Sequence, residues 1–344
     1  MNTPNKWYDK GSLLSYKMFF NMLIGNRGGG KTYSFKRWCI DDFLKTGKQF
    51  VWVRRFGTEI VELRKTFFDD IKDLYPNLEF KMSGSQKTGK IIINGVVAGY
   101  YVSLTTSAIL KSSAFPLVDK IVFDEFLIIG KTYHYLNDEV VMLLELIETI
   151  FRDRENIPNA VKPRGVYLLG NNITIANPYF LYFGVKPFKQ RFYIDKQKGL
   201  LVEMFTNDVF VESKKHSNIG KLTAGTTYAE YSIENKSYLD NDRFIAKKPA
   251  KCDFMCAIDF KNKTYGFWLD VKNGNCYVNN QFDPYSYNHY SLTRDDHSIN
   301  TFLIKNINNS YLRNIVWLFR AGCMYFDNHQ TKAQVYEMLS YFVR

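Results

Sequence analysis

The feature that most constrains this chain is a glycine-rich segment near its start. Residues 25–32 read Gly-Asn-Arg-Gly-Gly-Gly-Lys-Thr and match the phosphate-binding pattern G-x-x-x-x-G-K-[ST] at every fixed position. The mostly apolar residues 19–24 predict a short buried strand before it, and residues 32–44 predict a helix after it. This order of strand, loop and helix is the setting in which the pattern binds phosphate. The sequence therefore predicts a nucleoside triphosphate site in an α/β domain.

The glycines of this loop let its backbone N–H groups point inward, so that they form a concave site for anionic oxygens. The N-terminus of the following helix adds a partial positive charge. Lys31 is expected to reach the β- and γ-phosphates and so to serve catalysis, and the Thr32 hydroxyl is expected to bind Mg²⁺. The alternative is a glycine-rich turn that ends in Lys-Thr by chance. The predicted nucleotide-binding residues are Gly25, Asn26, Arg27, Gly28, Gly29, Gly30, Lys31 and Thr32, with Asn171.

A second motif supplies two carboxylates. Residues 120–125 read Lys-Ile-Val-Phe-Asp-Glu and predict a buried strand that ends at Asp124. An Asp at the end of such a strand helps to hold Mg²⁺ in phosphate-loop enzymes, and Glu125 is placed to polarise the attacking water as a general base. This Asp-Glu pair is typical of hydrolytic motor ATPases of the additional-strand (ASCE) type. It therefore favours a hydrolase that does mechanical work over a solvated strand end.

Two more polar residues follow predicted elements. Arg152 lies near the end of the helix predicted for residues 138–154, where it either acts as an arginine finger on a neighbouring subunit or complements the helix dipole. Asn171 follows the strand predicted for residues 165–170. It either hydrogen-bonds the γ-phosphate or the attacking water, or forms a turn.

Three further residues are weaker candidates. Arg54 and Arg55 end the strand predicted for residues 49–55, near the same rim as the carboxylates. Tyr16 is a candidate for stacking on the adenine base. No local pattern assigns a role to any of the three.

Composition and periodicity suggest the domain organisation. Alternating strands and helices predict an α/β domain with a mostly parallel sheet. A polar, weakly periodic linker or small intermediate segment follows, and new strands and helices then predict a small α+β domain of ordinary size. The net charge of +12 suggests a polyanionic partner, with nucleic acid first. No apolar run reaches the ~18 residues of a membrane span, so no membrane is expected. The predicted domains are residues 1–205, 206–250 and 251–344.

Five segments, taken in order, resemble the genome-packaging ATPases of small, protein-primed, short-tailed bacteriophages. The similarity runs nearly end to end, and the order and spacing of the five segments make it specific. The resemblance implies an encapsidation protein, a terminase-like motor that forms a homo-oligomeric, pentameric ring. ATP hydrolysis would drive double-stranded DNA through this ring into a procapsid. The five segments are residues 25–32, 50–55, 121–126, 149–155 and 177–183.

The same resemblance assigns roles to residues. It implies that Lys31 and Thr32 contact ATP, that Asp124 holds Mg²⁺, that Glu125 is catalytic and that Arg152 is a trans-acting arginine finger. The C-terminal domain resembles the RNase H-type nuclease fold of large terminase subunits. It looks vestigial, and no nuclease activity is assigned to it. The implied partners are the portal of the procapsid, DNA and, in some relatives, a packaging RNA. The implied location is the host cytoplasm, with transient docking at the portal vertex.

The sequence alone leaves three alternatives. A cytoplasmic P-loop helicase or recombination ATPase would share the same chemistry and would unwind duplexes. A binding module would sense nucleotide with little turnover. A terminase with an active nuclease would need several carboxylates to converge on paired metal ions, and the candidates are Asp259, Asp270, Asp283 and Asp327.

Overall fold

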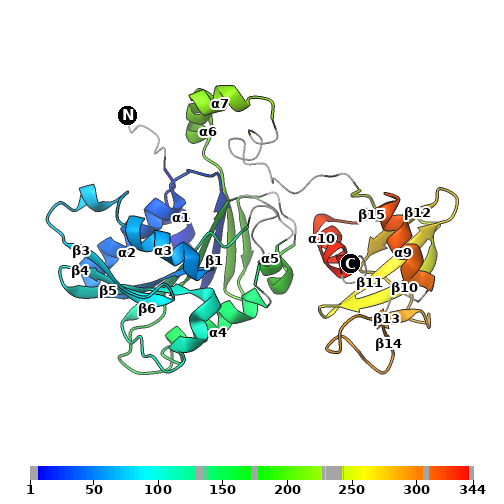
Figure 1. Cartoon of the computed structure of the whole chain (residues 1–344), viewed down its shortest axis with the longest axis horizontal. Coiled ribbons are helices and arrows are strands. Elements are labelled where there is room, and N and C mark those ends of the chain that lie inside the picture. The colour runs from blue at the N-terminus through cyan, green and yellow to red at the C-terminus, as the bar shows by residue number, and fades with distance from the viewer. Residues whose placement is uncertain are drawn as a thin grey trace. The chain divides into compact units, whose positions relative to one another are not determined.

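The computed structural model describes residues 7–128, 135–136, 138–171, 177–186, 188, 190–226, 229, 242, 244–304 and 310–340. The chain divides into two compact units (Figure 1). The first comprises Met1–Thr174 and Tyr182–Leu239, and the second comprises Ile175–Leu181 and Asp240–Arg344. Each unit has its own sheet and its own buried core. The domain boundaries inferred from the sequence, at 205 and 250, stay predictions.

The first unit is built on a sheet of nine strands in the described residues. The six strands in the middle of the sheet, which are β5, β2, β6, β7, β1 and β9 in spatial order, run parallel to one another. Strands β3, β4 and β8, at the two edges, are antiparallel to their neighbours. Parallel strands need long crossover connections, and the helices supply most of them. The strand order is β3 (Phe80–Gly84), β4 (Thr88–Ile93), β5 (Val96–Ser103), β2 (Gln49–Arg54), β6 (Val118–Asp124), β7 (Gly165–Asn171), β1 (Phe20–Gly25), β9 (Leu200–Phe205) and β8 (Phe192–Asp195).

Helices cover both faces of this sheet. The long helix α2 (Lys31–Thr46) follows β1 directly and buries Phe35, Cys39 and Ile40 in the same core as strand residues of the sheet. Helix α4 lies on the opposite face from α2 (Figure 1). The other helices of this part of the chain are α1 (Gly11–Ser15), α3 (Gly57–Thr66), η1 (Lys72–Leu74), η2 (Leu104–Leu110), α4 (Glu139–Phe151) and α5 (Pro178–Phe183).

Two predicted helices are shorter than expected. The sequence predicts a helix over residues 59–74, whereas the helix in the structure, α3, ends at Thr66. The reason is that Phe67 packs edge-on against Trp52 while Phe68 stacks on Phe80, and one helical stripe cannot bury two successive rings in different directions. The helix predicted for residues 138–154 is α4, which ends at Phe151. Arg152 has φ 48° and cannot continue a right-handed helix. Asn137, which the sequence offers as the N-cap of this helix, lies outside the described residues.

The segment predicted as a linker contains two short helices, α6 (Asp208–Lys215) and α7 (Asn218–Thr223). The side chains of Asn207 and Ser217 accept hydrogen bonds from the backbone N–H groups of Phe210 and Gly220. These are N-cap contacts of the kind that start helices in polar sequence. Local capping therefore adds structure where periodicity gave little signal.

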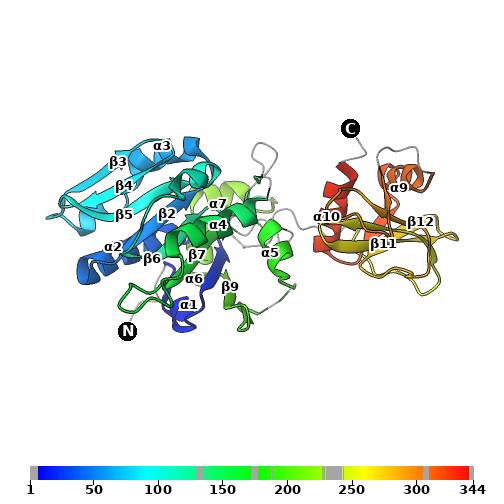
Figure 2. The ribbon, with the colours of Figure 1, turned by 90° about the horizontal axis from the view of Figure 1, so that it is seen from below.

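The second unit contains a six-stranded sheet in the described residues. Strands β10, β11 and β12 form an antiparallel meander, β13 and β14 continue it in parallel beyond β10, and β15 pairs in parallel with β12. Helices α9 and α10 share the buried core with the sheet (Figure 2). No helix in the described residues is long and apolar enough to cross a membrane. The elements are β10 (Asp253–Phe260), β11 (Lys263–Asp270), β12 (Asn275–Asn279), β13 (His289–Ser291), β14 (Phe302–Leu303), α9 (Ser310–Arg320), β15 (Met324–Phe326) and α10 (His329–Ser340).

Candidate active site

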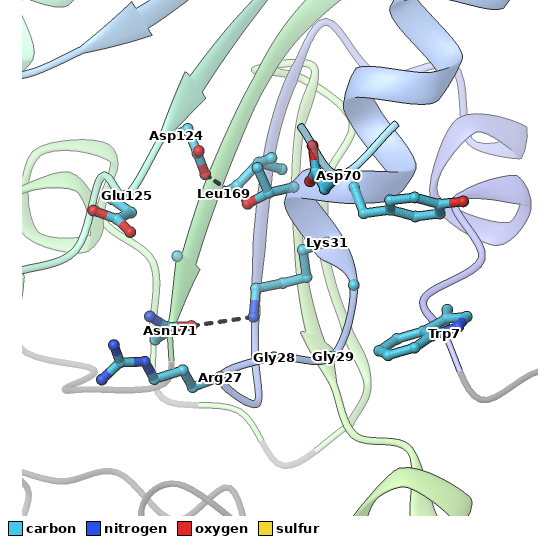
Figure 3. A pocket seen from close by; sticks show the side chains of 14 residues that line it. Trp7, Arg27, Gly28, Gly29, Lys31, Asp70, Asp124, Glu125, Leu169 and Asn171 are labelled. Atoms are coloured by element: carbon cyan, nitrogen blue, oxygen red, sulfur yellow. Dashed lines mark hydrogen bonds between the residues drawn. The ribbon is translucent and has the colours of Figure 1, made fainter. Parts of the chain in front are cut away.

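The carboxyl ends of β1, β6 and β7 meet at the glycine-rich loop and form the wall of a cavity of about 510 Å³ (Figure 3). Most of the residues predicted from the sequence line this cavity. Gly25 and Asn26 lie just beneath it, and Arg152 lies elsewhere. The lining residues are Trp7, Arg27, Gly28, Gly29, Gly30, Lys31, Thr32, Tyr33, Asp70, Asp124, Glu125, Leu169, Gly170 and Asn171.

Two loop glycines are required by the local geometry. Gly30 has φ +83°, a left-handed conformation that costs glycine little and other residues much more. A Cβ atom on Gly25 would lie 2.5 Å from the carbonyl oxygen of Phe205 on the neighbouring strand. The loop also receives a hydrogen bond from outside, because the Tyr8 N–H donates to the Gly29 carbonyl at 3.0 Å. The loop is therefore held in one shape by its own glycines and by the N-terminal segment.

Lys31 is the cation at the centre of the cavity, and it is 6% exposed. Its Nζ donates to the carbonyl oxygens of Gly25 at 2.9 Å and Asn26 at 2.6 Å, and to Asn171 Oδ1 at 3.3 Å. Among the described residues, no carboxylate forms an ion pair with it. Burial lowers the pKa of Lys31 to about 7, against the opposing charge of Asp124. The site therefore holds a buried amine that lacks a full negative partner, which a phosphate would supply.

Thr32 and Asp124 form a second contact at the mouth of the loop. The Thr32 hydroxyl donates to Asp124 Oδ1 at 3.0 Å. Burial raises the pKa of Asp124, although the charge of Arg54 opposes this shift. A hydroxyl and a carboxylate at one point are hard oxygen donors of the kind that Mg²⁺ prefers. This pair fits the metal role that the sequence predicted for both residues.

Arg54, at the end of β2, contacts both carboxylates of the Asp-Glu pair. Its Nη1 donates to Asp124 Oδ2 at 3.1 Å, and its Nη2 donates to Glu125 Oε2 at 2.9 Å. Burial alone would lower the pKa of Arg54, but the charges of Asp124 and Glu125 raise it. The sequence placed Arg54 at this rim without a role. The pairing joins residues 70 and 71 positions apart in the chain, and no local pattern signals it.

Glu125 and Asn171 extend from neighbouring strands toward the same space. In Figure 3, Asp124, Glu125 and Asn171 lie on one side of Lys31, and Trp7 lies on the other. Glu125 is exposed and has φ 60°. Strand β7, which carries Asn171, pairs with β1 on one side and β6 on the other. The sheet therefore brings the loop, both carboxylates and this amide to one edge.

Arg152 is not part of this cavity. It is exposed, it follows the last residue of α4, and its Nη2 donates to the Ser113 carbonyl at 2.8 Å. The nearby Arg154 is buried, and its guanidinium donates to the carbonyl oxygens of Ile150, Phe151, Pro116, Val118 and Val161. The buried contacts of Arg154 therefore fix the end of α4, and Arg152 is exposed to solvent at that end.

One residue predicted from the sequence lies away from the cavity, and three residues that line the cavity were not predicted. Tyr16 does not line the cavity and instead packs on Phe192, with 5.0 Å between the ring centroids. Trp7, Tyr33 and Asp70 line the cavity but were missed. The aromatic pair at residues 7 and 8 just upstream of the loop strand was the one signal that could have drawn attention to Trp7.

The acidic residues of the second unit have their own partners. Asp259 Oδ1 accepts a hydrogen bond from Thr264 and lies 2.9 Å from His289 Nε2. Asp270 accepts from the backbone and side chain of Asn273. Within the described ranges, no group of three or more His, Cys, Asp or Glu side chains is arranged to hold a metal ion.

The chain is similar to known proteins along nearly its whole length. The family model described as Podovirus DNA encapsidation protein (Gp16) matches residues 3–342. The DNA packaging protein of Bacillus phage B103 is 35% identical over 328 residues, which cover 95% of this chain and 98% of the relative. The solved bacteriophage Phi-29 viral genome packaging motor assembly contains a chain that aligns with a TM-score of 0.78 and 33% identity, over 98% of this chain and 99% of the other.

A second solved structure matches the first unit. The N-terminal domain of the DNA packaging ATPase from bacteriophage phi29 aligns with a TM-score of 0.51 and 34% identity, and it covers 58% of this chain and 96% of that domain. The mixed α/β sheet described above therefore occurs in a protein described as an ATPase. On the extent of the family match and the identity to these relatives, the chain belongs to the podovirus DNA encapsidation protein family.

Proposed function

We propose that this chain is the ATP-hydrolysing subunit of a motor that translocates double-stranded viral DNA into a preformed procapsid. One observation carries the proposal: Lys31, Thr32, Asp124, Glu125 and Asn171 converge on one cavity at the carboxyl edge of a parallel sheet. Ligand sites of open α/β sheets lie at such edges. The family match adds the DNA-packaging context.

The strand order supports the additional-strand (ASCE) class of ATPase. Strand β7 lies between the loop strand β1 and the carboxylate strand β6. Because of this extra strand, the Asp-Glu pair stands one strand away from the loop, and Glu125 lines the same cavity as the loop. We therefore assign Glu125 as the general base.

Each of the described side chains would have its own role in the reaction. Lys31 and the loop N–H groups bind the β- and γ-phosphates, and Thr32 with Asp124 would hold Mg²⁺, which when bound neutralises charge on the phosphates. Glu125 accepts a proton from the attacking water, and Asn171 offers its amide to the γ-phosphate. Arg54 engages one of the two carboxylate oxygens of Glu125, Oε2. Breaking this contact would free both oxygens to accept the proton, which would give the site a means of holding hydrolysis back.

The proposed motor is a ring of several copies of this chain. Arg152 is exposed and remote from the cavity of its own chain, which suits a finger that completes the site of the next subunit in a pentameric ring. A grip on the DNA backbone needs no base contacts, so we expect it to be independent of sequence and sensitive to salt. The portal and a packaging RNA are the other proposed partners, in the host cytoplasm and transiently at the portal vertex.

We assign the second unit to an RNase H-like fold without nuclease activity. Support comes from its strand order, in which an antiparallel meander, β10–β12, is extended in parallel by β13 and β14. The contact of Asp259 with His289 and Thr264 engages the carboxylate that a nuclease would need. Mg²⁺- or Mn²⁺-dependent DNA cutting that Asp259→Ala abolishes would contradict this assignment.

The test of the main proposal is steady-state ATP hydrolysis by the wild type, Lys31→Ala and Glu125→Gln, each with and without long double-stranded DNA. We expect DNA to stimulate the wild type, both variants to be inactive, and Glu125→Gln to retain nucleotide binding. Normal turnover by Glu125→Gln would remove Glu125 from its role. Unwinding of duplexes by the wild type would favour a helicase instead.

A mixing experiment tests the finger. Arg152→Ala subunits should regain part of their activity when mixed with Lys31→Ala subunits, because the latter lack turnover of their own but still supply Arg152 to a neighbour. Absence of rescue at every mixing ratio would argue against a finger that acts across subunits.

A further inference from the structure

Arg55 follows Arg54 directly, and the mechanism above leaves it without a role. It is 3% exposed. Its guanidinium carbon lies 5.4 Å from the centroid of the Phe123 ring and 5.3 Å from that of Tyr135. A buried guanidinium between two aromatic rings is held in a plane. Its five N–H donors therefore point in fixed directions.

Two of the contacts of Arg55 are with the backbone that carries the proposed general base. Its Nη1 donates to the carbonyl oxygen of Glu125 at 3.1 Å, and its Nη2 donates to that of Phe126 at 2.6 Å. Glu125 has φ 60°, a left-handed conformation that is uncommon for residues other than glycine. Such conformations persist where surrounding contacts hold them, and they concentrate at active sites. Arg55 supplies two of those contacts.

The opposite edge of the same guanidinium is fixed by a carboxylate. Arg55 Nε donates to Glu139 Oε2 at 2.7 Å, and Nη2 donates to Glu139 Oε1 at 2.9 Å. Glu139 is 2% exposed and is the first residue of α4. This bidentate pair fixes orientation as well as charge. It also ties the first turn of α4, the helix that Arg152 follows, to the backbone of Glu125.

The geometry points to Arg55 as a positioning residue for Glu125, oriented in turn by Glu139. This inference rests on the proposed role of Glu125. Arg54 meets the carboxylate of Glu125, whereas Arg55 meets its peptide, so the two adjacent arginines act on the same residue from different sides. Arg55 sets the direction in which the Glu125 side chain leaves the strand end, and hence its reach to the attacking water.

Arg55→Lys is the sharpest variant, because it keeps the positive charge and removes the planar fork. A lysine cannot satisfy two carbonyl oxygens and a bidentate carboxylate with the same geometry. We expect kcat to fall about 100-fold, the loss typical of a reacting group displaced by about 1 Å. The KM for ATP should stay close to wild type, whereas the melting temperature should fall, because a lysine leaves some of the buried oxygen atoms that Arg55 contacts without a partner. The matched control is Arg164→Lys, an arginine that pairs with carboxylates at the other end of the sheet and should leave kcat unchanged.

A double variant separates positioning from a purely structural role. Because Arg55 acts through Glu125, adding Arg55→Lys to Glu125→Gln should cause no further loss of residual turnover. A purely structural role predicts instead weaker ATP binding and an additional loss of turnover in the double variant, and this result would overturn the inference. A kcat for Arg55→Lys equal to wild type would do so as well.

Glu139→Gln keeps the test decisive if Arg55→Lys fails to fold. The amide can still accept one hydrogen bond from Arg55 but no longer fixes the guanidinium with two charged contacts. We expect a roughly tenfold loss in kcat with nucleotide binding intact, in the range seen when the partner of a functional group is removed. An unchanged kcat would count against the inference. Normal turnover by Glu125→Gln alone would instead refute the proposed function, so the two failures are distinguishable.

Discussion

The two ends of the parallel sheet each bury a lysine, and they treat its charge in opposite ways. At the amino end, Lys120 on β6 donates to Asp119 and, at 2.7 Å, to Asp42 Oδ2. Arg164 pairs with the same two carboxylates, with Asp42 at 3.1 Å and with Asp119 at 3.3 Å. Two cations thus face two anions. At the carboxyl end, Lys31 donates to two backbone carbonyls and an amide oxygen.

The difference separates a structural charge from a functional one. Lys120 is fully buried, and its cost of desolvation is offset by close ion pairs. Lys31 is almost as buried, and burial lowers its pKa to about 7. A buried ionisable group whose environment leaves its charge under-compensated, inside a cleft, is a mark of a binding or catalytic site. The carboxyl end of the sheet is therefore less stable without a ligand, and binding of an anionic ligand would raise its stability.

Lys120→Met should give the largest effect on stability. It leaves Asp119 and Asp42 with Arg164 alone in a buried setting, and breaking such a network costs about 3–5 kcal/mol of unfolding free energy. Urea-induced unfolding measures this loss, with Lys45→Met on the exposed side of α2 as the control. The ATP affinity of the folded fraction should not change. Unfolding free energy equal to wild type would remove the amino-end network from its structural role.

Lys31→Met should reverse this pattern. ATP turnover should fall by about 10²–10³-fold or more, as on loss of a key electrostatic contact to a transition state. The unfolding free energy without nucleotide should stay equal or rise, because the variant removes a buried charge that has little compensation. Turnover assays and urea unfolding of the same preparations check both parts. A destabilisation as large as that of Lys120→Met would erase the distinction between the two ends.

How far the sequence predicted this arrangement depends on how local each signal is. The loop, its flanking strand and helix, and the carboxylates after residues 120–123 follow from short patterns, and the structure has these elements. The shortened α3 was missed because Phe67 and Phe68 pack on different partners outside the helix, Trp52 and Phe80. The side-chain pairings at the site were missed for the same reason. Arg54 with Glu125 and Arg55 with Glu139 join residues 71 and 84 positions apart.

Arg54→Gln tests how charge is balanced at the carboxyl end of the sheet. Its guanidinium occupies one oxygen of Asp124 and one of Glu125 and so competes with a divalent cation for the same carboxylates. Removing it should raise the affinity of the nucleotide-free protein for Mn²⁺ by about tenfold, the order expected of one partly buried charge pair. A direct Mn²⁺ titration measures this change. Arg164→Gln is the control, since Lys120 still pairs with both carboxylates there, and equal Mn²⁺ affinities in the two variants would contradict the prediction.

The smallest expected effect concerns pH at the amino end. Burial would raise the pKa of Asp42, but hydrogen bonds and charges from Lys120 and Arg164 outweigh it and lower the pKa. A carboxyl whose pKa is lower in the folded state contributes its stability above the unfolded pKa of about 3.9 and loses it as the pH falls through the folded value. Because Asp42 is partly open to solvent, we expect about 1 kcal/mol or less.

Asp42→Asn isolates this contribution. The variant should be less stable than wild type at pH 7, and the two unfolding free energies should converge as the pH is lowered from 5 toward 3. Urea unfolding at several pH values measures the convergence, and the exposed Asp73→Asn provides the comparison. A gap that stays constant down to pH 3 would mean that Asp42 stabilises the fold through packing or neutral hydrogen bonds. The amino and carboxyl ends of the sheet would then differ in packing or neutral hydrogen bonds, and not in how they neutralise a buried charge.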